Sequence, residues 1–307
     1  MSAPLPSSLA PFALGPTWAH PTPRTLLVQV EAFDWLVDAP ENSVHAIVTD
    51  PPYSVLEYDE KDHQKLRQGK GGVWRIPPTL NGVQRAPLPR FSVLTPKERQ
   101  RLTGYFLEFG RLAQRVLKPG GHLLMASNPL VSTTSFAALE AVGWEKRGEI
   151  IRVVKTLRGG DRPKGAEDEF KDVTVMPKSC WEPWGLFRKP LSEKTVAANL
   201  RKWGTGGLRR ISENEPFRDL LEVSPARGVE RTLAPHPSLK PQRLMRELVP
   251  AMLPLGTGIL LDPYAGSGAT LAAAEHLGLE AVGLERDPEY FLMANQAIGP
   301  LSTLSLK

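Results

Sequence analysis

Residues 258–285 of this chain, GILLDPYAGSGATLAAAEHLGLEAVGLE, predict a strand, a glycine turn, a helix and a second strand. The first strand is an apolar run that ends at Asp262, and Gly266 and Gly268 lie in the turn before the helix. The second strand ends at Glu285. A β-α-β order of this kind is typical of a parallel sheet covered by helices, so the stretch predicts an α/β fold.

The glycine turn has the features of a site for an adenosine-containing ligand. Glycines let the backbone approach a ligand closely, and Glu285 can accept hydrogen bonds from two ribose hydroxyls. The third glycine of a dinucleotide site is missing, because Leu271 stands there, and no Lys-Ser/Thr pair of a phosphate-binding loop follows. Asp262 would repel a pyrophosphate but suits an amino-acid ammonium. S-adenosylmethionine (AdoMet) therefore fits better than NAD.

A second stretch, SVHAIVTDPPY at residues 43–53, ends a predicted strand in an acid, two prolines and a tyrosine. Pro51 and Pro52 fix backbone dihedrals and remove two amide donors, so the backbone is rigid there. Asp50 would lie at the carboxyl end of its strand, which is the edge of a parallel sheet where ligands collect.

Strands and helices alternate over most of the chain. Further strands are predicted at 24–30, 122–127, 149–156 and 179–190, and further helices at 31–39, 95–117, 129–143 and 240–253. We expect residues 24–190 and 236–300 to form a single catalytic and AdoMet-binding domain. The Pro-rich residues 1–23 are expected to be a poorly ordered arm, residues 56–94 a long loop insertion, and residues 191–235 a candidate target-recognition region.

Composition narrows the class of protein. The chain has 307 residues, of which 41% are hydrophobic and 23% charged, as is usual for a soluble globular protein. Its apolar runs are far shorter than the roughly 20 residues that span a bilayer, so no membrane segment is expected. A single cysteine, Cys180, excludes an internal disulfide and a thiolate metal cluster, and we expect no metal site. The single cysteine indicates a reducing cytoplasm, and the first residues lack the order of a secretory signal.

The basic charge is concentrated in the middle of the chain. The formal net charge is +5, whereas Lys146 to Arg210 contain sixteen Lys and Arg against eight Asp and Glu, a local +8. This region predicts a track for a phosphate backbone, and the alternative is a solvated surface around a β-rich segment. The candidate DNA contacts are Arg158, Arg162, Lys164, Arg201, Lys202, Arg209 and Arg210.

These motifs together resemble the AdoMet-dependent DNA amino-methyltransferases of the β arrangement. The quoted motifs are TDPPY at 49–53, RVLKPGGHLLM at 115–125, HPSLKPQRLMRELV at 236–249 and LDPYAGSG at 261–268. In that family the catalytic motif comes first, the target-recognition region lies between, and the cofactor motif comes last. The resemblance covers residues 24–298. It implies a Rossmann-like class I methyltransferase fold with circularly permuted motifs, a seven-stranded mostly parallel sheet and helices on both faces.

The resemblance also implies a role for the catalytic motif. Asp50 and the carbonyl of Pro51, held by Pro52, would accept hydrogen bonds from the exocyclic amine of a flipped base, and Tyr53 would stack on that base. The chemistry needs no covalent intermediate, and a carbon-5 cytosine mechanism is disfavoured. Family members with Asp before the prolines mostly methylate adenine N6, and those with Ser mostly cytosine N4, so Asp50 favours adenine and leaves N4-cytosine as the alternative.

On the cofactor side, the resemblance assigns the loop around the methionine part, the ribose acid and the motif that closes over the methionine carboxylate. These residues are Asp262, Pro263, Tyr264, Gly266 and Gly268 for the loop, Glu285 for the ribose, and Lys240 with Pro241 for the carboxylate. Glu31 aligns with an acid near the adenine, and His236 is interpreted as structural.

Two departures from the family pattern stand out. Ser54 replaces the usual Gly or Asn after the tyrosine, and the predicted strand at 149–156 lacks a tryptophan that often walls the base pocket. Trp181 and Trp184, beside Glu182, either pack in the core or stack near the extruded base.

The expected partner is double-stranded DNA in the cytoplasm, where the protein would associate with the nucleoid. A homodimer and a cognate restriction enzyme both stay open. Two alternatives belong to other classes of protein. One is a nicotinamide-dependent oxidoreductase, but the third glycine of a dinucleotide site is missing and such an enzyme would give DPPY no role. The other is a non-catalytic DNA-binding module. RNA as the substrate stays open as well.

Overall fold

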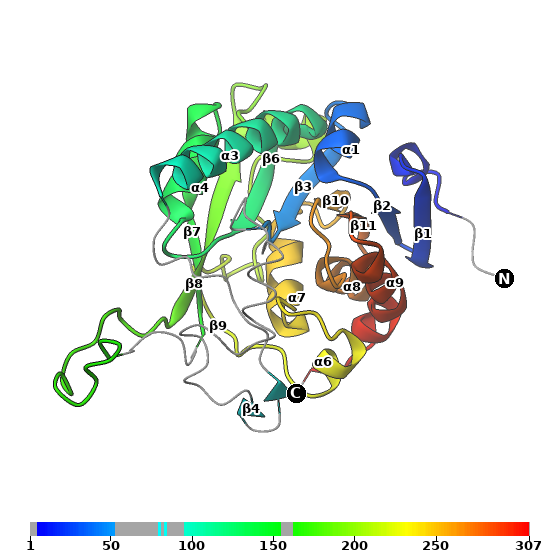
Figure 1. Cartoon of the computed structure of the whole chain (residues 1–307). Coiled ribbons are helices and arrows are strands. Elements are labelled where there is room, and N and C mark those ends of the chain that lie inside the picture. Colours follow the sequence, from blue (N-terminus) through cyan, green and yellow to red (C-terminus); the bar gives the residue numbers. More distant parts are fainter. Residues whose placement is uncertain (1–4, 53–78, 81–82, 85–94, 155–161, 307) are drawn as a thin grey trace.

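The computed structural model describes residues 5–52, 79–80, 83–84, 95–154 and 162–306. They form an α/β fold in which a large sheet lies between two groups of helices (Figure 1). The strands of this sheet are β1 (Thr17–Thr22), β2 (Thr25–Gln29), β3 (Val44–Thr49), β6 (Leu117–Ala126), β7 (Glu145–Val153), β8 (Trp181–Arg188), β9 (Leu220–Glu222), β10 (Ile259–Asp262) and β11 (Glu280–Glu285). A separate antiparallel pair consists of β4 (Thr79–Leu80) and β5 (Val83–Gln84).

The large sheet is mostly parallel, as predicted. Its order in the described residues is β1-β2-β11-β10-β3-β6-β8-β7-β9, and only β1 and β8 run against the others. The run from β2 to β7 supplies the seven strands that the family resemblance implied. The predicted total of seven is nevertheless wrong, because β1 and β9 each add a strand at an edge and bring the sheet to nine strands.

Helices cover both faces of the sheet. They are η1 (Ala10–Phe12), α1 (Ala32–Asp38), α3 (Pro96–Val116), α4 (Ser132–Ala141), α5 (Val196–Trp203), α6 (Val229–Leu233), α7 (Gln242–Ala251), α8 (Ala269–His276) and α9 (Pro288–Ser302). One group contains α1, α3 and α4, and the other contains α7, α8 and α9 (Figure 1). The start of α3 is set by a capping box, in which the Thr95 hydroxyl accepts from the Glu98 N–H and the Glu98 carboxylate accepts from the Thr95 N–H.

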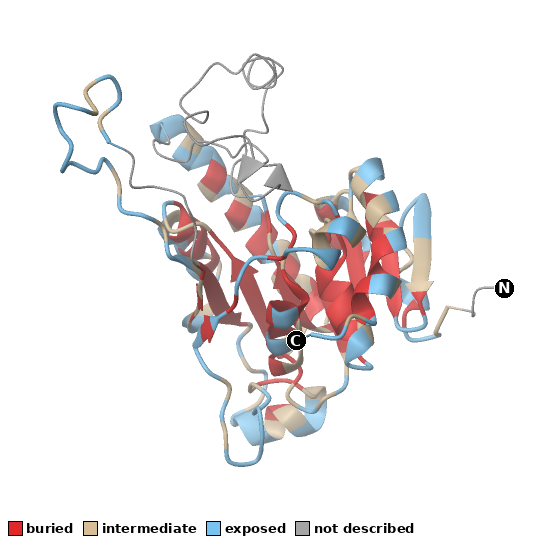
Figure 2. Ribbon diagram, turned by 90° about the horizontal axis from the view of Figure 1, so that it is seen from below, coloured by how far each residue is buried: buried red, intermediate tan, exposed pale blue. Residues whose placement is uncertain are grey.

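The sheet separates two hydrophobic cores. Alternate residues of β3 point to opposite faces, so Ala46 and Val48 pack with α7, α8 and α9, whereas Ile47 packs with α1, α3 and α4. Figure 2 shows that buried residues are concentrated in the sheet and in the parts of the helices that face it. Burial on both faces makes the central strands a rigid support for the residues at their ends.

The N-terminal segment differs from the expectation of a poorly ordered arm over residues 1–23. Leu9 and Phe12 are buried, and the Trp35 indole N–H donates to the Phe12 carbonyl over 3.0 Å. Strand β1 then pairs antiparallel with β2. Leu9 and Phe12 are ordered because they pack beside α1, a contact that the proline content of the segment does not indicate.

Residues 191–235 pack on the same sheet as the rest of the chain. Asn199 in α5 is buried and donates to the carbonyls of Pro119 and Thr205, each over 2.8 Å. Strand β9 pairs with β7. Apart from the four residues of β4 and β5, the expected 56–94 insertion lies outside the described residues. No helix among the described residues has the length and apolar character needed to cross a membrane.

The direction of winding changes between β3 and β10 at the centre of the sheet. These strands are parallel neighbours, with Leu260 opposite Ala46 and Leu261 opposite Ile47. The sheet continues through β6 on one side and through β11 on the other. Ligands bind in open α/β sheets outside the carboxyl ends of the strands at such a switch point, so the fold places a crevice beside Asp50 and Asp262.

Candidate active site

A cavity of about 900 Å³ opens at the carboxyl ends of the parallel strands. It is lined by residues from the ends of β2, β3, β10 and β11 and from the segment before α7. The predicted site residues in its lining are Glu31, Asp50, Pro51, Pro52, Lys240, Asp262, Pro263, Tyr264, Gly266 and Glu285. The structure therefore brings together the two motifs that lie more than two hundred residues apart in the chain.

Two of the described catalytic and cofactor candidates, Gly268 and Pro241, are not in this lining. Gly268 is the N-cap of α8, and Pro241 is the N-cap of α7, so both lie directly behind residues that do line the cavity. Tyr53 lies outside the described residues, as does the DNA-contact candidate Arg158.

Asp262 is a buried acid whose hydrogen bonds come from neutral donors. Its Oδ1 accepts from the Thr49 hydroxyl over 2.7 Å and from the Tyr264 N–H over 3.1 Å. Burial raises the pKa of Asp262 to about 6, although bonds from Thr270, Thr49 and the Tyr264 backbone work in the opposite direction. A cationic group in the cavity would stabilise the ionised form, so the site fits the ammonium of an amino acid.

The glycine turn gives the backbone access to the cavity. Gly266 and Gly268 have φ of +51° and +77°, a left-handed conformation that favours glycine. A Cβ on Gly266 would lie 3.3 Å from the His236 ring. That ring packs edge-on against Tyr290, and burial lowers the pKa of His236 to about 4, so the imidazole is neutral. These contacts support the structural interpretation of His236.

Glu285 is fixed by two backbone donors. Its Oε2 accepts from the Gly266 N–H and its Oε1 from the Asp287 N–H, each over 2.9 Å. Burial raises the pKa of Glu285, while these two bonds oppose that effect. Since each carboxylate oxygen has a second lone pair, Glu285 can also accept hydroxyl donors from a ligand in the cavity.

The Tyr264 side chain is hydrogen-bonded to a residue that the sequence analysis did not single out. The Tyr264 hydroxyl lies 2.5 Å from the hydroxyl of Tyr105 in α3. Burial raises the pKa of Tyr105 to about 12 and that of Tyr264 well above its usual value, so both phenols are neutral. The pair anchors the loop after β10 to the helix that covers it.

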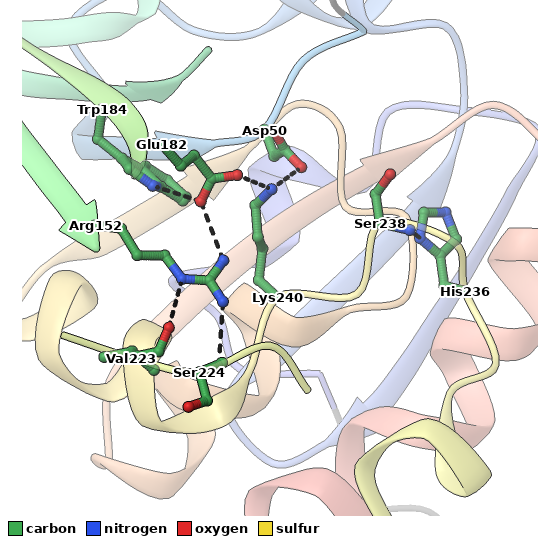
Figure 3. A network of polar contacts seen from close by, with 9 residues as sticks. All are labelled: Asp50, Arg152, Glu182, Trp184, Val223, Ser224, His236, Ser238 and Lys240. Atoms are coloured by element: carbon green, nitrogen blue, oxygen red, sulfur yellow. Dashed lines mark hydrogen bonds and ion pairs between the residues drawn. The ribbon is translucent and has the colours of Figure 1, made fainter. Parts of the chain in front are cut away.

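A buried network of ion pairs joins Asp50 to three strands and a helix start (Figure 3). Lys240 Nζ lies 2.6 Å from Asp50 Oδ2 and 2.8 Å from Glu182 Oε1. Glu182 Oε2 accepts from Arg152 over 3.1 Å and from the Trp184 indole over 3.2 Å. The family resemblance placed Lys240 at the methionine carboxylate, whereas in this structure its ammonium contacts the acid of the catalytic motif.

Comparison with known proteins identifies the family. A family model described as DNA methylase matches residues 44–296. The chain belongs to the N6/N4 DNA methylase family. It is 26% identical over 281 residues to the type II methyltransferase M.HindIII of Haemophilus influenzae, covering 84% of this chain and 90% of that protein. It is 22% identical to M2.DpnII of Streptococcus pneumoniae, covering 90% of each.

Three solved structures share the fold. The M1.HpyAVI–SAM complex is 18% identical with a TM-score of 0.55, covering 89% of this chain and 98% of that one. PvuII DNA methyltransferase, named as cytosine-N4-specific, is 15% identical with a TM-score of 0.57, covering 92% of this chain and 87% of that one. A DNA modification methylase of Thermus thermophilus, complexed with S-adenosyl-L-methionine, is 20% identical with a TM-score of 0.54, covering 91% and 96%. The predicted class I methyltransferase fold and AdoMet-dependent DNA methyltransferase family are confirmed.

The basic candidates of this DNA methylase lie at two different edges of the sheet. Arg162 and Lys164 belong to a loop over residues 162–180, which projects from the sheet and follows β7 at the edge where Asp50 lies (Figure 1). The other four described candidates lie near the strand starts, at the opposite edge. They are Arg201 and Lys202 in α5, whose Asn199 contacts the start of β6, and Arg209 and Arg210, with the Arg209 N–H donating to the Ala251 carbonyl ahead of β10.

Sequence reasoning missed Arg152 and the role of Glu182 in this family member. Trp184 is fully buried in the core, while Trp181 is 39% exposed and lines the cavity, so core packing holds for Trp184. A charged residue inside an apolar strand, as in EIIRVVK, was the available signal for Arg152, because such a residue needs a buried partner.

Proposed function

We propose that this DNA methyltransferase transfers the methyl group of AdoMet to the exocyclic N6 amine of a flipped adenine at a specific site in double-stranded DNA. The observation that carries the proposal is the shared cavity of Asp50 and Asp262. One wall holds an acid followed by two prolines, and the other holds the glycine turn with Glu285. A base amine and a methyl donor would meet between them.

The described residues fit AdoMet in three places. Asp262, Gly266 and the adjacent loop residues Pro263 and Tyr264 would hold the methionine part, with Gly268 and Pro241 shaping the backbone behind the cavity. Glu285 would accept the ribose hydroxyls, and Glu31 at the end of β2 would lie toward the adenine. When bound, AdoMet supplies a methyl group on a positively charged sulfonium.

The catalytic motif addresses the weak nucleophilicity of an aromatic amine, whose lone pair is delocalised into the ring. Asp50 and the Pro51 carbonyl would accept the two N–H groups, which favours a tetrahedral nitrogen with its lone pair directed at the methyl carbon. The nitrogen would bond to this carbon as the carbon–sulfur bond breaks, with the electron pair of that bond remaining on sulfur. The proton that the methylated nitrogen loses would pass to solvent from its hydrogen bond with Asp50. Tyr53 would stack on the base.

Adenine is proposed over cytosine because of the acid at position 50. In the family that the motifs resemble, Asp before the prolines mostly accompanies adenine N6 and Ser mostly accompanies cytosine N4. The neighbour PvuII DNA methyltransferase is named as cytosine-N4-specific, and the two chains are 15% identical. Methylation of cytosine N4 by the same chemistry is the second candidate function.

The biological setting is proposed from the relatives. M.HindIII and M2.DpnII are named as type II methyltransferases, which supports a restriction-modification role for this chain with a cognate restriction enzyme. Cytoplasmic DNA would then be the partner, with Arg162 and Lys164, in the loop that follows β7, as the basic candidates at the same edge of the sheet as Asp50.

The test is to express the chain in a host that lacks DNA methylation, digest the genome to nucleosides and identify the modified base by mass. We expect N6-methyladenine, and none with Asp50→Asn, while AdoMet binding by the purified variant persists. N4-methylcytosine would instead establish the second candidate. An unmodified genome with normal AdoMet binding would reject DNA amino-methylation, and full activity of the variant would reject the role of Asp50.

A further inference from the structure

We propose that Glu182 is a positioning residue for methyl transfer, which shares the Lys240 ammonium with Asp50 and so sets the position of the catalytic carboxylate. The proposal rests on the role of Asp50 proposed above. It adds a residue from β8, outside both motifs, to the machinery of the reaction.

Glu182 is itself held in one place. Its Oε2 accepts from Arg152 Nη1 over 3.1 Å and from the Trp184 indole over 3.2 Å (Figure 3). Arg152 is buried, and its other nitrogens donate to the carbonyls of Val223 over 3.1 Å and Ser224 over 3.2 Å at the end of β9. Because contacts from three strands fix the Glu182 carboxylate, it can hold the Lys240 ammonium in one position.

The Lys240 ammonium contacts two carboxylates at similar distances. Its Nζ lies 2.8 Å from Glu182 and 2.6 Å from Asp50, and its side chain is only 12% exposed. The two carboxylates raise the pKa of Lys240 against the effect of burial, and Lys240 with Arg152 lowers the pKa of Glu182 to about 2. Two cationic and two acidic side chains therefore contact one another in one buried group.

This sharing matters for the reaction because Asp50 must accept a hydrogen bond from a neutral amine. If Asp50 were the only partner of the Lys240 ammonium, this ion pair would occupy the Asp50 carboxylate. The neutral amine of the base would then compete with a full positive charge for the same oxygen atoms. Glu182 takes part of the attraction, so the Lys240 ammonium is held between two carboxylates and not by Asp50 alone. Fixed contacts of this kind pre-organise a reacting group, and their loss slows the chemical step more than it weakens ground-state binding.

The alternative is that these ion pairs only stabilise the fold. The same two strands offer a matched comparison at their opposite end, where buried Arg188 in β8 lies against Glu145 in β7, with Arg188 Nε 2.8 Å from Glu145 Oε2. Glu145→Gln removes a carboxylate from a buried arginine, as Glu182→Gln does, but far from the cavity. A role in folding alone would let Glu182→Gln lower the unfolding temperature without slowing methyl transfer by the folded variant.

The experiment compares Glu182→Gln with Glu145→Gln by single-turnover methyl transfer to DNA, AdoMet calorimetry and thermal unfolding. We expect Glu182→Gln to slow the single-turnover rate by roughly tenfold to 100-fold, as expected for a misplaced reacting group, with the AdoMet Kd within about twofold of the wild type. Glu145→Gln should keep the wild-type rate. Glu182→Asp, which restores the charge on a shorter stem, should recover part of the lost rate.

Three results would overturn the proposal: a wild-type rate in Glu182→Gln, an equal loss in Glu145→Gln, or a loss that follows AdoMet affinity in proportion. If Glu182→Gln does not fold, Trp184→Phe decides, since it removes one bond to Glu182 and keeps an aromatic ring in the core. It should slow methyl transfer without weakening AdoMet binding, and an unchanged rate would overturn the proposal. Asp50→Asn separates the two ideas, because an active Asp50→Asn rejects the role of Asp50 whatever Glu182→Gln does.

Discussion

The hydroxyl of Thr49 donates a 2.7 Å hydrogen bond to Oδ1 of Asp262, and this bond links the two halves of the site. Thr49 is the last residue of β3 and directly precedes Asp50, while Asp262 is the last residue of β10. Both side chains are buried. The acid proposed for the cofactor ammonium is therefore held by the strand that carries the catalytic motif.

Thr49→Val should weaken AdoMet binding at neutral pH. The valine keeps the shape of the buried side chain but removes a donor that lowers the pKa of Asp262, so this pKa should rise further above about 6. Less of the carboxylate is then ionised to receive the ammonium. Calorimetric titration over a pH series should show the decline in affinity beginning at a higher pH than in the wild type, and coinciding curves would contradict the coupling.

The raised pKa of Asp262 predicts that a rise in pH strengthens AdoMet binding but lowers the free energy of unfolding. AdoMet affinity should fall as pH decreases through about 6, because the carboxyl becomes neutral. A pKa that is raised in the folded state gives stability at low pH that is lost as pH rises through the folded value. Asp262→Asn should therefore gain stability relative to the wild type as pH rises from about 4 to about 6, with no further gain at higher pH, while binding AdoMet weakly throughout.

Denaturant unfolding of the two proteins at several pH values measures that difference directly. A constant difference between the unfolding free energies would mean that Asp262 has no raised pKa in the folded protein. Asp287→Asn is a control from the same edge, since it caps α9 through the Glu289 and Tyr290 N–H groups. This control shows whether a change in stability at this edge arises from the cap of α9 instead of from Asp262.

The central fold was predictable because its signals are local and continuous. Apolar runs that end in Asp50, Asp262 and Glu285 mark strand ends, and parallel strands must bring those ends to one edge. The edge strand β1 was not predictable in the same way. It depends on the packing of Phe12 and Leu9 against α1. A Pro-rich stretch has no hydrophobic periodicity from which this contact could be predicted.

The ion-pair network shows where sequence reasoning about the site fails. Lys240 was assigned through its motif, but an ammonium contacts whichever carboxylates the fold brings near. Glu182 comes from β8 and Asp50 from the end of β3, and no spacing in the chain relates the two. The order of strands in the sheet, with only β6 between β3 and β8, makes them neighbours of the same lysine.

Substitution of the two turn glycines by alanine should affect different properties, namely the stability of the protein and its binding of AdoMet. Both have a left-handed backbone, which costs a residue with a Cβ about 1–2 kcal/mol. A Cβ on Gly268 would also lie 2.5 Å from the Ile298 side chain inside the core, whereas Gly266 lines the cavity. Gly268→Ala should therefore lower the unfolding temperature more, and Gly266→Ala should weaken AdoMet binding more; the reverse ranking in calorimetry and thermal unfolding would reject this division.

The two sets of basic residues predict which edge of the sheet meets DNA. Neutralising Arg162 and Lys164 to glutamine should weaken DNA binding and lower the slope of log affinity against log salt by about 1 for each phosphate that is no longer paired with a cation. Neutralising Arg201 and Lys202 removes the same charge at the opposite edge and should leave both quantities near the wild type. Because the base must reach Asp50, a phosphate track at that far edge would have to act across the whole sheet. A larger decrease from the second pair, measured by fluorescence anisotropy over a salt series, would place the DNA there instead.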